Sequence, residues 1–172
     1  MEYGWREYAF DSSVAIGLPG ARVLPWLVAP DLMPAWIIGL VAVTPLNAAP
    51  GAVGGQTRLD FGSGHGKPGT FHGEILELTD TLLVRRYRPG FDPDGYERTV
   101  RYDLRPDGPG SALTCSVHTR LLAAQSLSFA PATRNGLKHL SRSLDKLRLA
   151  AEGTRVPLPT RIGDSGLLPQ AL

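Results

Sequence analysis

The sequence predicts an α+β fold, in which one curved antiparallel sheet of seven strands covers a long C-terminal helix. Three observations predict it. Leucines in residues 131–152 recur every three or four positions, the period of a helix with one apolar face. Short segments with strand-like alternation fill most of residues 40–121, and turns rich in glycine and proline separate them. The helix needs a sheet to bury its apolar stripe, because such a helix is not stable alone in water.

The N-terminal part predicts one strand and two short helices. Residues 8–16 alternate weakly between apolar and polar types and predict the first strand, which a Pro-Gly pair ends. Residues 21–28 and 31–38 predict two helices, which prolines and a glycine keep short.

Six further strands are predicted next, and the short turns between them make neighbouring strands antiparallel. They are residues 40–46, 56–63, 70–78, 82–88, 96–104 and 112–121. Alternation predicts which side chains of the last two strands share the buried face. Those side chains are Tyr96, Arg98, Val100, Tyr102 and Leu104 on one strand and Leu113, Cys115, Val117, Thr119 and Leu121 on the other.

The terminal helix is predicted over residues 131–152, with an apolar stripe formed by Leu137, Leu140, Leu144, Leu147 and Ala151. Gly136 falls inside this helix at a cost of roughly 1 kcal/mol relative to alanine. Residues 153–172 contain three prolines and predict an extended tail. The chain therefore divides into a domain of residues 1–152 and a tail of residues 153–172.

Composition excludes several classes of function. The net charge of +2 is too small to predict nucleic acid as a partner. The N-terminal residues do not read as a signal peptide, and the longest apolar run is too short for a membrane span. Cys115 is the single cysteine, so no internal disulfide forms. We expect a cytoplasmic protein without an integral membrane segment.

Motifs for phosphate, metal and nucleophile chemistry are absent or incomplete. The glycine-rich loop of residues 62–67 lacks the spacing of a phosphate-binding loop and joins two strands rather than a strand and a helix. Cys115 and His118 are three residues apart on a strand, so they point to opposite faces. His72 and Glu74 share a face, but two ligands do not make a metal site. We expect no metal and no cofactor, and the sequence assigns no catalytic residue.

Several phrases carry a resemblance to a known family. They are Ile-Gly-Leu-Pro-Gly-Ala-Arg-Val at residues 16–23, Asp-Leu-Met-Pro-Ala-Trp at residues 31–36 and Gly-Glu-Ile-Leu-Glu-Leu at residues 73–78, followed by a Gly-rich turn before the last strand. Together with the order of elements over residues 8–152, they make the chain resemble the START-like (SRPBCC) superfamily, in particular its polyketide cyclase/dehydrase branch. The resemblance implies the helix-grip fold, with an apolar cavity between the sheet and the terminal helix.

The function expected from this resemblance is binding of a hydrophobic small molecule, such as a lipid, an isoprenoid or an aromatic polyketide. Mostly apolar side chains with a few polar groups are typical of such sites. The side chains predicted to line the cavity are Trp36, Phe61, Phe71, Ile75, Arg98, Val100, Tyr102, Leu137 and Leu140. Two alternatives stay open. One is a cyclase or dehydratase that uses the same cavity, and the other is a regulatory module with a filled core. A homodimer through the outer sheet face or the tail also stays open.

Arginines decide between these alternatives. Arg98 and Arg86 share strand faces with apolar residues, so each either lines a pocket or reaches water near a strand end. Arg85 and Arg101 are predicted on the outer, solvated face. The enzyme alternative needs a base near Arg98, and only His118, His72 and Glu74 are available. That version fails if Arg98 and His118 lie on opposite sides of the sheet.

Overall fold

The computed structural model describes residues 4–62, 69–90, 94–122 and 135–153, together with the backbone of residues 158–161 and 167–170. The elements in these ranges are β1 (Trp5–Ile16), α1 (Gly20–Val28), η1 (Met33–Ala35), β2 (Leu40–Pro45), β3 (Gln56–Phe61), β4 (Gly69–Leu78), β5 (Leu82–Pro89), β6 (Tyr96–Asp107), β7 (Gly110–Leu122), α3 (Gly136–Ala151), β8 (Leu158–Arg161) and β9 (Leu167–Gln170).

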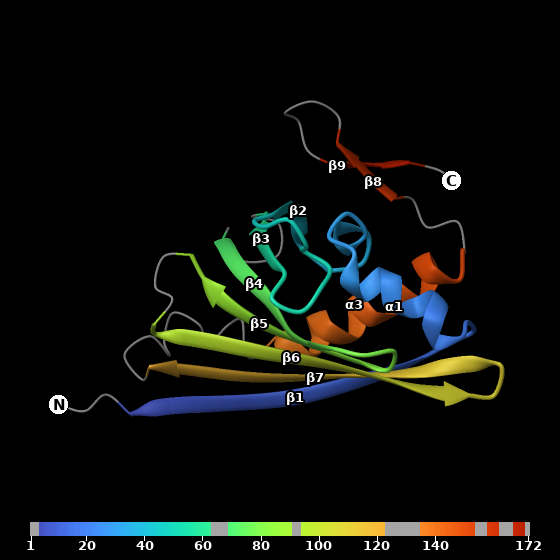
Figure 1. Ribbon diagram of the computed structural model, residues 1–172, viewed down its shortest axis with the longest axis horizontal. Coiled ribbons are helices and arrows are strands. Elements are labelled where there is room, and N and C mark those ends of the chain that lie inside the picture. Colours follow the sequence, from blue (N-terminus) through green and yellow to red (C-terminus); the bar gives the residue numbers. More distant parts are fainter. Residues whose placement is uncertain are drawn as a thin grey trace.

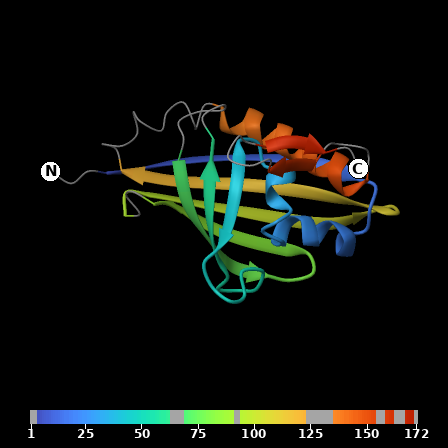
Figure 2. The same cartoon turned by 90° about the horizontal axis from the view of Figure 1, so that it is seen from above.

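Seven strands form one antiparallel sheet in the order β1-β7-β6-β5-β4-β3-β2. The sheet curls around α3, and α1 and η1 cover one end of it (Figure 1). In Figure 2 the strands at the β2 edge run steeply across the long strands β6 and β7, as expected for a strongly twisted sheet. The predicted fold class is confirmed. None of the described helices is long and apolar enough to cross a membrane.

Two elements differ from the prediction. The second short helix is reduced to the single 3-10 turn η1, which contains Pro34. A proline has no N–H to donate to the carbonyl four residues earlier, so a regular helix that starts at residue 31 cannot run through Pro34. In the predicted tail, the backbone of β8 pairs with that of β9 in an antiparallel hairpin. The predicted division of the chain at residue 152 stays a prediction, and residues 131–134 of the predicted helix lie outside the described residues.

Alternate side chains of each strand point toward α3, and we call this side of the sheet the inner face. The predicted inner faces of β6 and β7 are confirmed, because Val100, Tyr102 and Cys115 are buried in the core. Val100 is paired with Val117 and Tyr102 with Cys115 across the two strands. Burial raises the pKa of the Cys115 thiol to about 12, so this residue acts as a small uncharged core side chain.

Arg85 corrects the sequence-based assignment of β5. Its side chain was predicted on the outer face, but it is only 2% exposed and lies on the inner face with Leu83 and Tyr87. Arg86 instead points outward and pairs with Glu74. Both alternating sets of this strand contain apolar residues, so periodicity did not decide the face.

Arg85 closes the C-terminal end of α1. Its terminal nitrogens donate to Leu27 O at 2.7 Å and to Val28 O at 3.0 Å. The carbonyls of the last helical turn need donors from outside the helix, and Pro30 has no N–H to supply one. A cation at this position also interacts favourably with the negative end of the helix dipole. Indole Nε1 of Trp36 supplies a third donor, to Trp26 O at 2.9 Å.

Contacts in the middle and at the C-terminal end hold α3 against the rest of the fold. Ser141 shares a hydrogen bond with Ser12 of β1, and Ser143 Oγ accepts one from the Ile38 backbone N–H at 3.1 Å. At the C-terminal end, Glu152 accepts a hydrogen bond from the Gly17 backbone N–H at 2.8 Å. Together these contacts fix the apolar stripe of the helix toward the sheet.

Gly136, which the sequence placed inside the helix, is the first residue of α3. A Cβ atom at this position would come within 2.6 Å of Phe10 Cζ. Glycine therefore lets the start of the helix approach β1 closely, and the expected helix-propensity cost is smaller at a terminus than in the interior.

Candidate functional site

The two ends of the inner face differ in packing. The end beneath α1 and η1 is filled by side chains of the core. We call the opposite end, where β3 and β5 end and β6 begins, the distal end. In Figure 1 the distal end lies on the side away from α1. Helix α3 also begins there, since Gly136 contacts β1 and Glu152 reaches the loop beyond β1 at the other end.

An aromatic row crosses the distal end of the inner face. The rings of Phe61 and Phe71 meet edge to face with centroids 5.8 Å apart, and Phe71 and Tyr96 meet at 5.9 Å. Leu140 of α3 packs partly buried against the core, and Leu137, one turn earlier, is 48% exposed. The helical period places both leucines on the same stripe as the buried Leu144. Apolar side chains of the sheet and of the helix thus gather at this end.

A polar belt crosses the inner face next to the aromatic row. Strand register places its members opposite one another in the order β3, β5, β6, β7, β1, with Gly73 of β4 between the first two. The side chains of the belt are Thr57, Tyr87, Arg98, Thr119 and Tyr8. Each of them carries a hydroxyl or a guanidinium, and none is acidic.

Arg98 lies at the centre of this belt. Its Nε donates a hydrogen bond to Thr119 Oγ1 at 3.0 Å, and the guanidinium lies 5.8 Å from the ring centroid of Tyr96. Burial raises the pKa of Tyr96, and the positive charge of Arg98 partly opposes this shift. Burial likewise raises the pKa of Tyr87, against the opposing effect of Arg85. Both tyrosines therefore stay protonated hydrogen-bond donors at neutral pH.

Beyond the belt, the inner face is packed core. Trp36 and Tyr102 meet edge to face with centroids 6.2 Å apart, and Ile75 and Val100 are buried beside them. Gly73 illustrates how tightly the belt rests on this core: a Cβ atom there would come within 2.9 Å of the Tyr87 ring and 3.2 Å of Leu59.

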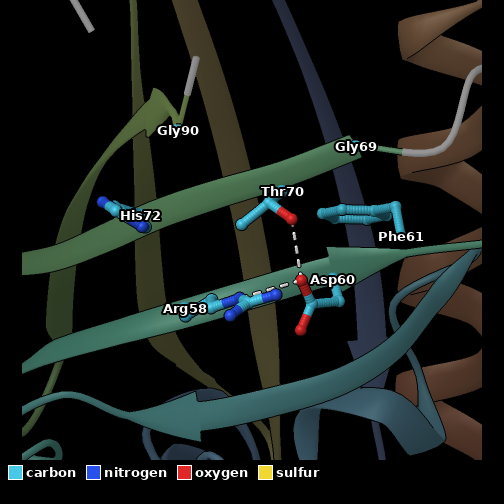
Figure 3. A pocket seen from close by; sticks show the side chains of 7 residues that line it. All are labelled: Arg58, Asp60, Phe61, Gly69, Thr70, His72 and Gly90. Atoms are coloured by element: carbon cyan, nitrogen blue, oxygen red, sulfur yellow. Dashed lines mark hydrogen bonds and ion pairs between the residues drawn. The ribbon is translucent and has the colours of Figure 1, made fainter.

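Two depressions are lined by described residues, and both reach the outer side of the sheet. The first encloses about 570 Å³ at the distal ends of β3 to β5. Figure 3 shows Thr70 and Arg58 pointing toward Asp60, with Phe61 lying apart from them on the side nearer α3. Asp60 accepts hydrogen bonds from Thr70 Oγ1 at 2.8 Å and Arg58 Nε at 3.1 Å. The polar groups of Asp60, Thr70 and Arg58 thus hydrogen-bond to one another.

The second depression, of about 400 Å³, lies over β1, β6 and β7 and includes His118. Nε2 of His118 is 3.4 Å from Glu7 Oε2 on the outer face. Arg98 is on the inner face, paired with Thr119. His72 and the Glu74–Arg86 ion pair are also on the outer side. The version of the enzyme alternative that uses these bases with Arg98 is therefore wrong.

The predicted site residues fall into three groups. Phe61, Phe71, Leu137 and Leu140 lie at the distal end, Arg98 lies in the polar belt, and Trp36, Ile75, Val100 and Tyr102 lie in the packed core. Sequence reasoning left out Tyr87, Thr119 and Tyr8 of the belt. The pattern of a single strand carries no signal for them, because the register that aligns these polar positions exists only in the folded sheet. Among the described residues, no three His, Cys, Asp or Glu side chains lie close enough to hold a metal ion.

Comparison with known proteins gives a match in structure alone. No family model and no curated protein matches the sequence. The protein CV1439 from Chromobacterium violaceum has a TM-score of 0.66 and 20% identity, over 84% of this chain and 96% of that one. Norcoclaurine synthase from Thalictrum flavum, solved in complex with dopamine and hydroxybenzaldehyde, has a TM-score of 0.63 and 15% identity, over 85% and 88% of the two chains.

The protein Ara h 8.0201 has a TM-score of 0.58 and 15% identity, over 83% of this chain and 99% of that one. Ara h 8 and norcoclaurine synthase are Bet v1-like proteins of the START-like superfamily. The assignment of this chain to that superfamily, and to its polyketide cyclase/dehydrase branch, stays a prediction. The element order, the curled seven-stranded sheet and these structural matches together identify the fold of this chain as the helix-grip fold.

Proposed function

We propose that this protein binds a hydrophobic small molecule between the distal end of the sheet and the start of α3. The observation that carries the proposal is that an inner-facing aromatic row, Phe61, Phe71 and Tyr96, lies at the end of the sheet where α3 begins with Leu137 and Leu140 (Figure 1). Leu137 belongs to the stripe that faces the sheet, yet it is 48% exposed. An apolar ligand would cover this leucine and the edges of the rings.

The packing of the core limits how deep the ligand reaches. Trp36, Ile75, Val100 and Tyr102 are each at most 6% exposed, so they form the floor of the site rather than its walls. The ligand would contact Phe61, Phe71, Leu137 and Leu140. Burial of apolar surface supplies roughly 25 cal/mol per Å² before the costs of association. The aromatic ligands in the norcoclaurine synthase structure are consistent with a site of this kind in the same fold.

A titration with the neutral fluorescent probe N-phenyl-1-naphthylamine tests the proposal. We expect the wild-type protein to bind it with a saturable rise in fluorescence. Leu137→Glu should weaken binding by about tenfold or more, because it removes an apolar contact and places a charge beside the ligand. The substitution should fold, since the side chain is already half-exposed and an acidic residue is favourable in the first turn of a helix.

Leu76→Glu is the matched control. Leu76 is 40% exposed, similar to Leu137, but it lies in β4 away from the start of α3. We expect its probe affinity to equal that of wild type. Absence of saturable binding by the wild-type protein, or equal affinities of the two glutamate variants, would contradict the proposal and favour a regulatory module with a filled core.

A further inference from the structure

We infer that the ligand carries an anionic group, such as a carboxylate, phenolate or sulfonate, and that Arg98 in the polar belt holds this group. The inference rests on the proposed function, since it concerns the same distal site. It adds the chemical class of the ligand: an amphipathic molecule with an apolar body and an acidic head.

The composition of the belt favours an acceptor-rich, negatively charged partner. Thr57, Tyr87, Thr119 and Tyr8 each carry a hydroxyl, and those of Thr57 and Thr119 are buried. Arg98 has five N–H donors, of which Nε donates to Thr119 Oγ1. Among the described residues, no carboxylate lies within 4.0 Å of the Arg98 guanidinium. A partly buried cation without a counter-charge is costly, and an anionic ligand would relieve that cost.

The other strand arginines make Arg98 distinctive. Four of them lie on the outer face and pair with carboxylates, in the pairs Arg58–Asp60, Arg86–Glu74, Arg88–Glu97 and Arg101–Asp103. Arg85, which is buried on the inner face, donates from its terminal nitrogens to two backbone carbonyls of α1. Arg98 is thus a partly buried inner-face arginine whose side-chain partners among the described residues are the hydroxyls of Thr119 and Tyr96 and no carboxylate. Arg6, which its register with Leu121 also places on the inner face, is exposed to solvent.

The order of the layers sets the orientation of the ligand. The aromatic row lies at the distal end, the belt lies one step further in, and the packed core follows. A molecule that enters from the distal end therefore rests its apolar body on Phe61 and Phe71 and directs its acidic head to Arg98. In this partly desolvated position, a charge-assisted hydrogen bond is stronger than it would be in water.

Two probes with the same aromatic skeleton test the inference. N-phenyl-1-naphthylamine is neutral, and 8-anilinonaphthalene-1-sulfonate adds one sulfonate. We expect Arg98→Met to lower the affinity for the sulfonate probe by about tenfold or more and to leave the affinity for the neutral probe within about twofold. Arg98→Lys keeps the charge and should retain most of the affinity for the sulfonate probe.

Arg101→Met is the matched control, because Arg101 is on the same strand but on the outer face with Asp103. It should change neither affinity, which excludes a general loss of positive charge as the cause. Thermal unfolding by circular dichroism checks that each variant is folded. If Arg98→Met does not fold, Arg98→Gln takes its place, because glutamine can still hydrogen-bond to Thr119 without the charge.

The outcomes separate the two proposals. A selective loss of the sulfonate probe supports the inference. If wild type binds both probes and the neutral Arg98 variants bind them as wild type does, or weaken both equally, the role of Arg98 is overturned and the hydrophobic site stands. If wild type binds neither probe, the proposed function itself is overturned.

Discussion

Replacement of Arg85 by methionine should destabilise this fold more than any substitution of an outer-face arginine. Arg85 is almost completely buried, and it donates to Leu27 O at 2.7 Å and Val28 O at 3.0 Å at the end of α1. Methionine fills a similar volume but donates no hydrogen bond, so Arg85→Met leaves two carbonyls of the last helical turn without these donors.

The magnitude follows from these two contacts. A buried acceptor that loses its donor costs about 1–3 kcal/mol, and two of them set an upper bound near 6 kcal/mol. Relief of the desolvation of the guanidinium offsets part of this loss. We therefore expect the free energy of unfolding to fall by about 2–4 kcal/mol in Arg85→Met. Arg85→Lys keeps the charge but not the forked geometry, and should fall in between.

The adjacent residue supplies the control. Arg86 lies next to Arg85 in β5, but it points outward to Glu74, and about a third of each side chain is exposed. Exposed ion pairs contribute about 0–1 kcal/mol, so Arg86→Met should cost no more than that. Urea unfolding followed by tryptophan fluorescence measures both variants. Equal losses in Arg85→Met and Arg86→Met would refute the assignment of Arg85 as the donor that closes α1.

Two further predictions concern the core. Gly73→Ala should lower the free energy of unfolding by about 1–3 kcal/mol, because its Cβ would press on the Tyr87 ring and Leu59. Gly90→Ala is the control and should be neutral, since the nearest neighbours of a Cβ there are at 3.6 Å or more. Similar losses of the two variants in urea unfolding would show that crowding at Gly73 is not the cause. For Cys115, the unfolded thiol ionises near its ordinary pKa of 9.0 and the folded thiol only near about 12. The contribution of the thiol to the free energy of unfolding is therefore complete below pH 9 and is lost toward pH 12, by about 1.4 kcal/mol per pH unit. In urea unfolding between pH 9 and pH 12, the free energy of unfolding should decline less steeply with pH in Cys115→Ala than in wild type. Parallel declines of the two proteins would contradict this.

Sequence reasoning succeeded where one alternating set of a strand was clearly more apolar than the other. On β6 and β7 it predicted the buried face that contains Val100, Tyr102 and Cys115. On β5 it failed, because Leu82, Leu83 and Val84 are consecutive and both sets look apolar. The face of this strand is decided by Arg85, whose partner Leu27 lies 58 residues away in the sequence.

The candidate site likewise has a part that the sequence predicted and a part that it did not. The sequence alone was sufficient to predict a grip of seven strands around an amphipathic helix and to select Phe61, Phe71, Arg98 and Leu140 as candidates, because periodicity within an element reflects which side of it is buried. Only the tertiary structure separated the distal end from the packed core and assembled the polar belt around Arg98. Register between strands and contact between a helix end and a distant side chain are properties of several segments at once, and the pattern of a single segment does not contain them.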